Sequence, residues 1–346
     1  MKEIRLCYIS RNYRGIESSG NKAKTDNEET LADLNAYNLG LPTTYYNSKI
    51  LTFCLNLIGI LRMVCTLCSG DMVVLQYPVK KYFAFICRFA RLRGASTIAL
   101  IHDLGSMRRK KITTRHEISR LMKADYVIAS NEHMEQYLRE NGYTHPLGAL
   151  GLFDYRSLTT PQEQTSWTNC PRVVYAGALA ENKNSFLRLM SQQVKSYQLD
   201  IYGNKNGLPG LTDSEHVKIG GFMPSDAFIE HVEGHFGLVW DGADLHTCSG
   251  SFGEYLRWNS PHKVSFYLRA GLPVIIWRQA ALAKLVQEEG IGLCIDSLEE
   301  LNNLLPTMTA ERYEEMKKQV QRVSERLRTG RYFTEALQKA IGQLTK

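Results

Sequence analysis

The sequence predicts an α/β protein of two Rossmann-like, doubly wound domains with a cleft between them. Three observations lead to this prediction. The 346 residues exceed the usual size of one domain, short β-rich runs alternate with helical stretches along the chain, and one polar, proline-containing segment interrupts the alternation near the middle. Hydrophobic residues at 44% and charged residues at 22% are ordinary globular values, which excludes a disordered or fibrous chain.

Four β-rich runs mark the strands of the first predicted domain. They lie at residues 4–10, 72–78, 96–102 and 125–130, with apolar helical stretches at 50–68 and 79–93 between them. We interpret the first stretch as a buried or half-buried core helix, because Asn56 and Arg62 interrupt an apolar run shorter than the about 20 residues that a spanning helix needs. Asn131 is expected to cap a further helix that Gly142 ends.

A second series of β-rich runs follows the polar segment. Its strands are expected at residues 172–177, 198–203, 217–222, 235–242 and 272–277, before a charged helix at 312–327 and a last amphipathic helix. The predicted domains are therefore 1–156 (N-terminal, acceptor side), 157–171 (linker), 172–330 (C-terminal, nucleotide-sugar-binding) and 331–346, a helix that returns toward the N-terminal domain.

Positive charge is concentrated in the first half. Residues 1–150 contain 21 Lys and Arg against 13 Asp and Glu, whereas the remainder contains 21 against 22. Within residues 80–115 there is one acid, Asp103, and the basic residues are Lys80, Lys81, Arg88, Arg91, Arg93, Arg108, Arg109, Lys110, Lys111 and Arg115. Such a block favours phosphorylated substrates or an anionic membrane. Nucleic acid is not expected, because no nucleic-acid-binding signature accompanies the block.

Several common ligand signatures are missing from the sequence. It has no GxGxxG after a strand and no GxxxxGK[ST], which argues against a nicotinamide, flavin or P-loop nucleotide site. It has no Asp-x-Asp for a divalent cation, and no second pair follows Cys65 and Cys68 at metal-like spacing. No cofactor and no metal are therefore expected. The first residues indicate a strand and not a signal peptide, so we expect a cytoplasmic protein with reduced cysteines.

The segment 248–274 carries the clearest binding signal of the second half. Lys263 is predicted at the N-terminus of a helix that Gly271 ends. Free N–H groups and the helix dipole attract anions there, so a lysine at this position is misplaced unless it faces a bound anion. We therefore interpret Lys263 as a phosphate-binding residue. Gly177 and Gly203 follow strands at the edge where such sheets bind ligands, although each alone is typical of an ordinary turn.

In the first half, His102 and Asp103 follow a predicted strand at the ligand-binding edge. A loop with Gly20 and Lys22 follows the first strand. A His-Asp pair at a strand end is also typical of a hydrogen-bonded turn. A direct role for Asp103 and this structural alternative stay equally open, and a direct role for His102 is the weaker of the two hypotheses.

Five segments in order along the chain resemble a bacterial family of GT-B glycosyltransferases. That family contains β-1,6-galactofuranosyltransferases of O-antigen synthesis and glucosyltransferases that extend glycans on serine-rich adhesins. The matching segments are Gly20–Ala23 with Asp26, IHDLGSMR (101–108), VVYAGALAENKNSFL (173–187), GLVWDG (237–242) and GEYLRWNSPHKVSFYLRAGLPVIIW (253–277). The last segment is the most specific.

The resemblance implies a donor site for a nucleoside-diphosphate sugar in the second domain and an acceptor site in the first. Carried over by position, the donor-binding residues are Gly177, Lys183, Tyr202, Gly203, Asp241, Tyr255, Asn259 and Lys263, with Lys263 and Asn259 at the diphosphate. The residues on the acceptor or donor-sugar side are Gly20, Lys22 and His102. Broader GT-B transferases often place a ribose-binding Glu where this chain has Phe266, which argues against a retaining mechanism like theirs.

These observations lead to one hypothesis with two alternatives. The hypothesis is an inverting, metal-independent hexosyltransferase that moves galactofuranose, or next glucose, from a UDP-sugar to a lipid-linked or other surface saccharide. Asp103 is the expected base, and Lys263 is expected to hold the leaving diphosphate. The alternatives are a non-catalytic partner subunit or glycan-binding protein of the same fold, and a basic membrane- or polyanion-binding protein. Peripheral attachment to the inner face of a membrane and a homo-oligomer stay open.

Overall fold

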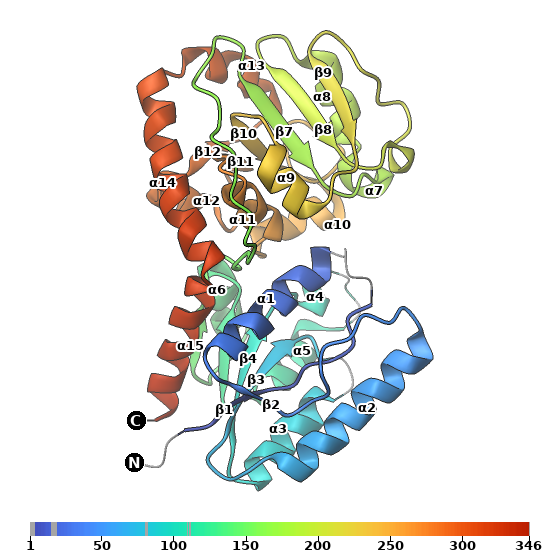
Figure 1. The fold of residues 1–346 in the computed structure, drawn as a ribbon, viewed down its shortest axis with the longest axis vertical. Coiled ribbons are helices and arrows are strands. Elements are labelled where there is room, and N and C mark those ends of the chain that lie inside the picture. Colours follow the sequence, from blue (N-terminus) through green and yellow to red (C-terminus); the bar gives the residue numbers. More distant parts are fainter. Residues whose placement is uncertain (1–3, 15–18, 80–81, 109, 111, 346) are drawn as a thin grey trace. The chain divides into compact units, whose positions relative to one another are not determined.

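The computed structural model describes residues 4–14, 19–79, 82–108, 110 and 112–345. The chain divides into two compact units, Met1–Asp154 with Thr329–Lys346 and Tyr155–Arg328 (Figure 1). Each unit contains a six-stranded sheet whose neighbouring strands run parallel. The predicted α/β class with two parallel sheets is confirmed. Of the basic block, Lys80, Lys81, Arg109 and Lys111 lie outside the described residues.

The first sheet has the strand order β2-β1-β3-β4-β5-β6. Its strands are β1 (Leu6–Tyr8), β2 (Tyr37–Asn38), β3 (Met72–Tyr77), β4 (Ser96–Ile101), β5 (Tyr126–Ala129) and β6 (Leu147–Ala149). At its centre, β3 and β4 pair along their whole length, from Met72 opposite Ser96 to Tyr77 opposite Ile101. Both strands are almost continuous apolar runs and are almost fully buried, as expected of a parallel sheet with both faces covered.

The helices of the first unit include one contributed by the end of the chain. They are α1 (Ser19–Asp33), α2 (Lys49–Thr66), α3 (Phe83–Leu92), α4 (Gly105–Arg108), α5 (Thr114–Leu121), α6 (Glu132–Glu140) and α15 (Arg331–Leu344). Asn131 caps α6 as predicted, since its Oδ1 accepts from the Met134 N–H at 2.9 Å. The buried carboxylate of Asp154 accepts from the N–H groups of Tyr332 and Phe333 at 3.2 and 2.8 Å. It thereby fixes the start of α15, which packs on β5, β6 and α1.

Helix α2 corrects the prediction of a core helix. Only Gly59, Ile60 and Met63 are buried, and most of the remaining apolar side chains are exposed or half-buried. The run is apolar on both faces, so its periodicity could not show which face turns inward. By length and hydropathy, α2 is the one helix within the described residues that could cross a membrane, and 17% of it is buried. A single helix of this kind is weak evidence for a span.

The second sheet has the order β12-β11-β10-β7-β8-β9. Its strands are β7 (Arg172–Ala176), β8 (Gln198–Tyr202), β9 (Val217–Gly221), β10 (Phe236–Val239), β11 (Val274–Trp277) and β12 (Gly292–Ile295). Its helices are α7 (Glu181–Asn184), α8 (Phe186–Gln193), α9 (Ser225–His231), α10 (Gly250–Gly253), α11 (His262–Arg269), α12 (Ala283–Glu288), α13 (Leu301–Leu304) and α14 (Ala310–Arg328). Because β7 and β10 are neighbours, the strand order reverses between them, which is where open α/β sheets bind ligands.

The segment 157–171 contains no helix or strand and belongs to the second unit. Buried Gln164 donates to the carbonyls of Val232 and Ala270 at 3.1 and 3.0 Å. Arg269 at the end of α11 donates to the carbonyl of Thr159 at 2.9 Å. These bonds hold the segment against the end of the helix that carries Lys263.

Candidate active site

The candidate site begins at the point where the order of the second sheet reverses. Gly177 directly follows β7, and Asp241 follows β10 after one residue, so both lie at the carboxyl ends of the two neighbouring strands. Helix α11 begins at His262, and Lys263 is therefore in its first turn, as predicted. The first turn of α11 contains no acidic side chain. These elements place the open backbone of Gly177, the carboxylate of Asp241 and the ammonium group of Lys263 where ligands of this fold bind.

Lys263 is held in an unusual environment for a lysine. Its Nζ lies 3.9 Å from the centre of the Tyr175 ring, a cation–π contact. A Cβ on Gly177 would lie 3.6 Å from the same Nζ, so the glycine keeps the approach to the ammonium group clear. Burial lowers the pKa of Lys263 to about 7, the nearby carboxylate of Asp241 opposes that shift, and Lys183 adds to it. The amine therefore changes charge near neutral pH.

Asp241 balances only part of this positive charge. Lys183 Nζ lies 3.7 Å from Asp241 Oδ2 and 5.6 Å from the Phe252 ring centre. Asp241 thus pairs with Lys183, and its charge also raises the pKa of Lys263. Within the described part of the chain, Lys263 Nζ, Asp241 Oδ1 and Asn259 Oδ1 are buried and have no hydrogen-bond partner. Buried polar atoms without partners cost about 1–3 kcal/mol each, and a polar ligand removes that cost.

Asn259 and Tyr255 belong to the turn before α11. Tyr255 lies in the short 3₁₀ helix Glu254–Arg257 and is buried. Its carbonyl accepts from the Asn259 N–H at 3.1 Å. Tyr255 therefore shapes the turn through its backbone, and Asn259 presents its side-chain oxygen four residues before Lys263.

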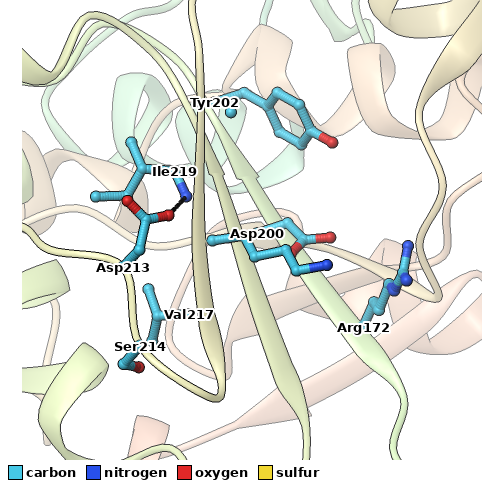
Figure 2. Close-up of a pocket in the computed structure, with 9 residues that line it drawn as sticks. Arg172, Asp200, Tyr202, Asp213, Ser214, Val217 and Ile219 are labelled. Carbon is cyan, nitrogen blue, oxygen red and sulfur yellow. Dashed lines mark hydrogen bonds between the residues drawn. The ribbon is translucent and has the colours of Figure 1, made fainter.

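The backbone of Tyr202 and Gly203 borders the candidate site, whereas the Tyr202 ring lines a separate hollow. The Gly177 N–H donates to the Tyr202 carbonyl at 3.0 Å, and a Cβ on Gly203 would lie 2.4 Å from the Gly177 carbonyl oxygen. The backbone of both residues thus borders Gly177. The Tyr202 ring instead lines a hollow with Arg172 and the buried Asp200 (Figure 2). The predicted role of Tyr202 in donor binding stays a prediction.

Phe266 belongs to an aromatic cluster. Its ring lies 4.6 Å from that of Phe228 and 5.5 Å from that of Tyr155, measured between ring centres. An apolar ring in this packing offers nothing to a ribose hydroxyl. What this departure means for ribose binding and for the mechanism stays a prediction.

In the first unit, Asp103 lies in the turn between β4 and α4. Its carboxylate forms an ion pair with Arg108 and stays partly accessible. The turn is fixed from below by buried Glu117, which accepts from the N–H groups of Gly105 and Ser106 at 2.9 and 2.8 Å and from the Tyr77 hydroxyl at 2.8 Å. Glu117 therefore fixes the backbone of the turn that contains Asp103.

His102, Lys22 and Gly20 take different places in the same unit. The Nε2 of His102 is 2.9 Å from Gln76 Oε1, and its ring stacks on Phe153 at 4.8 Å. Lys22 pairs with buried Asp26 on the same helix, α1. Gly20 is exposed in the first turn of α1. His102 and Lys22 thus have partners within the first unit, and Gly20 lies on its helix α1.

The structure brings four of the predicted donor-site residues together in the second unit, and it shows two supporting residues, one in each unit, that the sequence analysis did not name. Gly177, Lys183, Asp241 and Lys263 do meet. Tyr175, under Lys263, was overlooked, although a tyrosine two residues before the strand-ending glycine is a visible signal. Glu117 was also overlooked. A glutamate on the apolar side of α5, beside Ile118 and Leu121, is the signal that could have identified it.

A comparison with solved structures defines the class of the protein. The apo form of WaaB, a lipopolysaccharide outer core galactosyltransferase, superposes with a TM-score of 0.60 at 13% identity, covering 97% of this chain and 99% of that one. At this identity the likeness concerns the fold alone. With its two parallel sheets, the chain has the GT-B fold of glycosyltransferases.

Sequence comparisons then identify the family. Residues 6–152 match the glucosyltransferase 3-like N-terminal domain, and residues 173–340 match the C-terminal domain of the same family. The β-1,6-galactofuranosyltransferase WbbI of Escherichia coli K12 is 32% identical over 288 residues, which cover 81% of this chain and 82% of that protein. Glucosyltransferase 3 of Streptococcus gordonii is 26% identical over 279 residues, 79% of each chain. The chain belongs to the glucosyltransferase 3-like family of glycosyltransferases, as its resemblance implied.

Proposed function

We propose that this glycosyltransferase moves a hexosyl group from a UDP-sugar to a saccharide acceptor, with galactofuranose the first choice of sugar and glucose the second. The observation that carries the proposal is the buried Lys263 amine beside Gly177, with Asp241 and Lys183 at the reversal of the second sheet. The choice of sugar rests on the relatives, since WbbI at 32% identity is a galactofuranosyltransferase and the relative at 26% is a glucosyltransferase.

The donor diphosphate would occupy the space in front of Gly177. There it meets Lys263 directly and adds negative charge to a group of two ammonium ions and one carboxylate. The Lys263 amine then stays protonated, because an adjacent anion favours its charged form. Asn259 completes the set of polar groups, and Asp241 accepts hydrogen bonds from the donor's hydroxyl groups.

Transfer would proceed with inversion in one displacement. The acceptor oxygen forms a bond to the anomeric carbon while the bond from that carbon to the diphosphate oxygen breaks. The acceptor proton passes to the Asp103 carboxylate, and the negative charge that develops on the leaving diphosphate is stabilised by Lys263. Lys263 thereby takes the role that a divalent cation has in metal-dependent transferases, and we propose that the reaction needs no metal.

The acceptor would be a lipid-linked glycan or another saccharide of a surface polysaccharide, with the reaction in the cytoplasm. The support for this part is the sequence likeness to WbbI and to glucosyltransferase 3, whose names assign them the transfer of sugars. The alternatives of a non-catalytic partner subunit or glycan-binding protein are separated from the proposal by activity of the purified chain.

The deciding experiment is a screen of nucleotide sugars with the purified protein. UDP-galactofuranose, UDP-glucose, UDP-galactose and UDP-N-acetylglucosamine are compared by thermal shift and calorimetry. A donor at 100 times its dissociation constant should add about 2.7 kcal/mol to the free energy of unfolding. Transfer to a saccharide acceptor is then followed by NMR in the presence and absence of EDTA.

We expect UDP-galactofuranose to give the largest shift, a β-linked product and equal rates with and without EDTA. A protein that neither binds nor turns over any of the four donors would be a partner subunit or a glycan-binding protein. A product that keeps the anomeric configuration of the donor would overturn the inverting mechanism, and loss of turnover in EDTA would overturn its metal independence.

A further inference from the structure

Helix α2 of the first unit directs its polar side chains toward the unit and exposes apolar side chains. Its polar side chains face the unit: Thr52 Oγ1 accepts from Asn12 Nδ2 at 2.7 Å, and Asn56 Oδ1 accepts from the Asn12 N–H at 3.3 Å. Arg62, the other charged residue of the helix besides Lys49, donates to the Gly40 carbonyl. A surface helix in water normally has the opposite arrangement.

The outer face of α2 is apolar and exposed. It comprises Ile50, Phe53, Leu57, Ile58 and Leu61, spaced at three, four, one and three residues. This spacing puts them on one stripe of a helix. Ile50 is 78% exposed, Leu61 56% and Ile58 50%. A contiguous apolar stripe of this kind marks an interaction site, since single exposed apolar residues are common but stripes are not.

Helix α3 borders this stripe and adds charge. The two helices contribute to one hydrophobic core, and Arg93 just after α3 donates to the carbonyl of Leu67 just after α2 at 3.1 Å, so their ends lie side by side (Figure 1). Arg88, Arg91 and Arg93 are exposed on or beside α3. Phe85 and Leu92 are exposed among these arginines. The surface is therefore an apolar stripe with a basic fringe.

We propose that the outer face of α2, with the arginines of α3, docks on an anionic lipid bilayer. The helix would lie in the plane of the interface, with its stripe among the acyl chains and the arginines at the headgroups. This inference stands apart from the proposed transfer reaction, because no residue of the donor site takes part in it.

Two observations favour a bilayer over other occupants. In a symmetric contact between two copies, each stripe would bring its own arginines near those of the other copy, in a half of the chain with 21 basic against 13 acidic residues. An anionic surface turns the same charges into an attraction. The helix also lies on its unit and does not leave it, since the bonds of Thr52, Asn56 and Arg62 would be lost if it crossed the membrane.

The test is a double variant, Ile58→Gln with Leu61→Gln, compared with the parent protein. Both side chains are at least half exposed, and glutamine is a good helix former, so the fold is kept. Binding is measured by co-sedimentation with vesicles of phosphatidylcholine with and without phosphatidylglycerol. The parent should prefer the anionic vesicles and lose binding as salt rises, and the variant should bind them about tenfold or more weakly.

The matched control removes two exposed leucines of the second unit, Leu158→Gln with Leu189→Gln, and should bind vesicles like the parent. The thermal shift with a UDP-sugar is recorded for all three proteins, so a failure of the transfer hypothesis is seen separately. Unchanged vesicle binding by the α2 variant, or equal binding of the parent to both lipids, would overturn the proposal. A parent dimer that the α2 variant splits, with vesicle binding unaffected, would show that a second copy covers the stripe.

Discussion

The carboxyl edges of the two sheets treat their polar groups in opposite ways. In the second unit, among the residues that the structure describes, Lys263 Nζ, Asp241 Oδ1 and Asn259 Oδ1 are buried without a hydrogen-bond partner. In the first unit, Asp103 pairs with Arg108, and His102 contacts Gln76. Polar atoms at the second edge therefore lack hydrogen-bond partners, whereas Asp103 and His102 at the first edge have partners within their own unit.

This difference indicates two kinds of site. Unsatisfied buried groups lower stability and are kept where a ligand completes them, so the second edge is prepared for a ligand that offers an anion to Lys263 and hydrogen-bond donors to Asp241 and Asn259. At the first edge, the Asp103 carboxylate is already paired with Arg108 and is only partly accessible to an acceptor. Donor binding should therefore depend strongly on single side chains of the second unit, and Asp103 should matter for turnover more than for binding.

The largest expected effect concerns Asp103. Asp103→Asn keeps the shape of the side chain but removes the carboxylate that accepts the acceptor proton. Loss of a general base typically lowers the rate about 10²–10⁴-fold. We therefore expect turnover to fall by that factor while the affinity for the UDP-sugar changes less than about twofold, as measured by initial rates and by calorimetry.

Glu140→Gln is the matched control, because it removes an exposed carboxylate of the same unit that bonds only Gln136 among the described contacts. Its turnover should equal that of the parent. If Asp103→Asn transfers sugar within a few-fold of the parent, the base is another group. His102 would be tested next, followed by Glu17, which lies outside the described residues.

The second effect concerns the affinity of the donor site. Lys263→Met removes the ammonium group but keeps an unbranched side chain of similar length over Tyr175. A charge-assisted contact to a phosphate contributes about 1.5–3 kcal/mol, so the affinity for the UDP-sugar should fall about ten- to a hundredfold. The comparison is made by calorimetry, with Lys318→Met on the exposed face of α14 as control.

The pH dependence of this affinity sharpens the same prediction. Burial lowers the pKa of Lys263 to about 7, so the free protein loses this charge as the pH rises through that value. Parent affinity should be constant below about pH 6 and fall by up to about tenfold per pH unit above pH 7. In Lys263→Met the slope should vanish. An affinity that falls equally in both proteins would assign the titration to another group.

Much of the fold could be predicted because the longer strands are almost continuous apolar runs in the sequence. The runs at 72–78 and 172–177 became β3 and β7 within one residue at each end. By contrast, β2 (Tyr37–Asn38), β6 (Leu147–Ala149) and β12 (Gly292–Ile295) were not predicted. They are two to four residues long or contain glycine, and only their pairing in the sheet makes them strands.

The candidate site was predictable in part for a similar reason. Lys263 conflicts locally with the dipole of α11, and that conflict is visible in the sequence. The partners of Asp103 and the direction of the Tyr202 ring are not, because they depend on contacts such as Glu117 with Gly105 that join distant parts of the chain. The orientation of α2 could not be predicted for the same reason, since its inward hydrogen bonds are made with Asn12 and Gly40.

The smallest expected effect concerns the stability of the unliganded protein. The pKa of Lys263 lies at about 7 in the folded protein, below its ordinary value of 10.5, because the amine is buried. Below pH 7 the folded protein must bury a charged amine, and the full cost of that burial is present. As the pH rises from 7 toward 10.5 the folded protein has already released the proton while the unfolded chain still holds it, so the cost disappears.

Lys263→Met should therefore be more stable than the parent by about 1–2 kcal/mol near pH 6 to 7, because an apolar side chain replaces a buried charge. The difference in stability should shrink toward zero near pH 10. Urea unfolding at several pH values, without nucleotide, measures it. A variant that is less stable than the parent near pH 6, or a difference that does not change with pH, would show that the ammonium group is satisfied in the unliganded protein, and the contrast between the two sheet edges would then be lost.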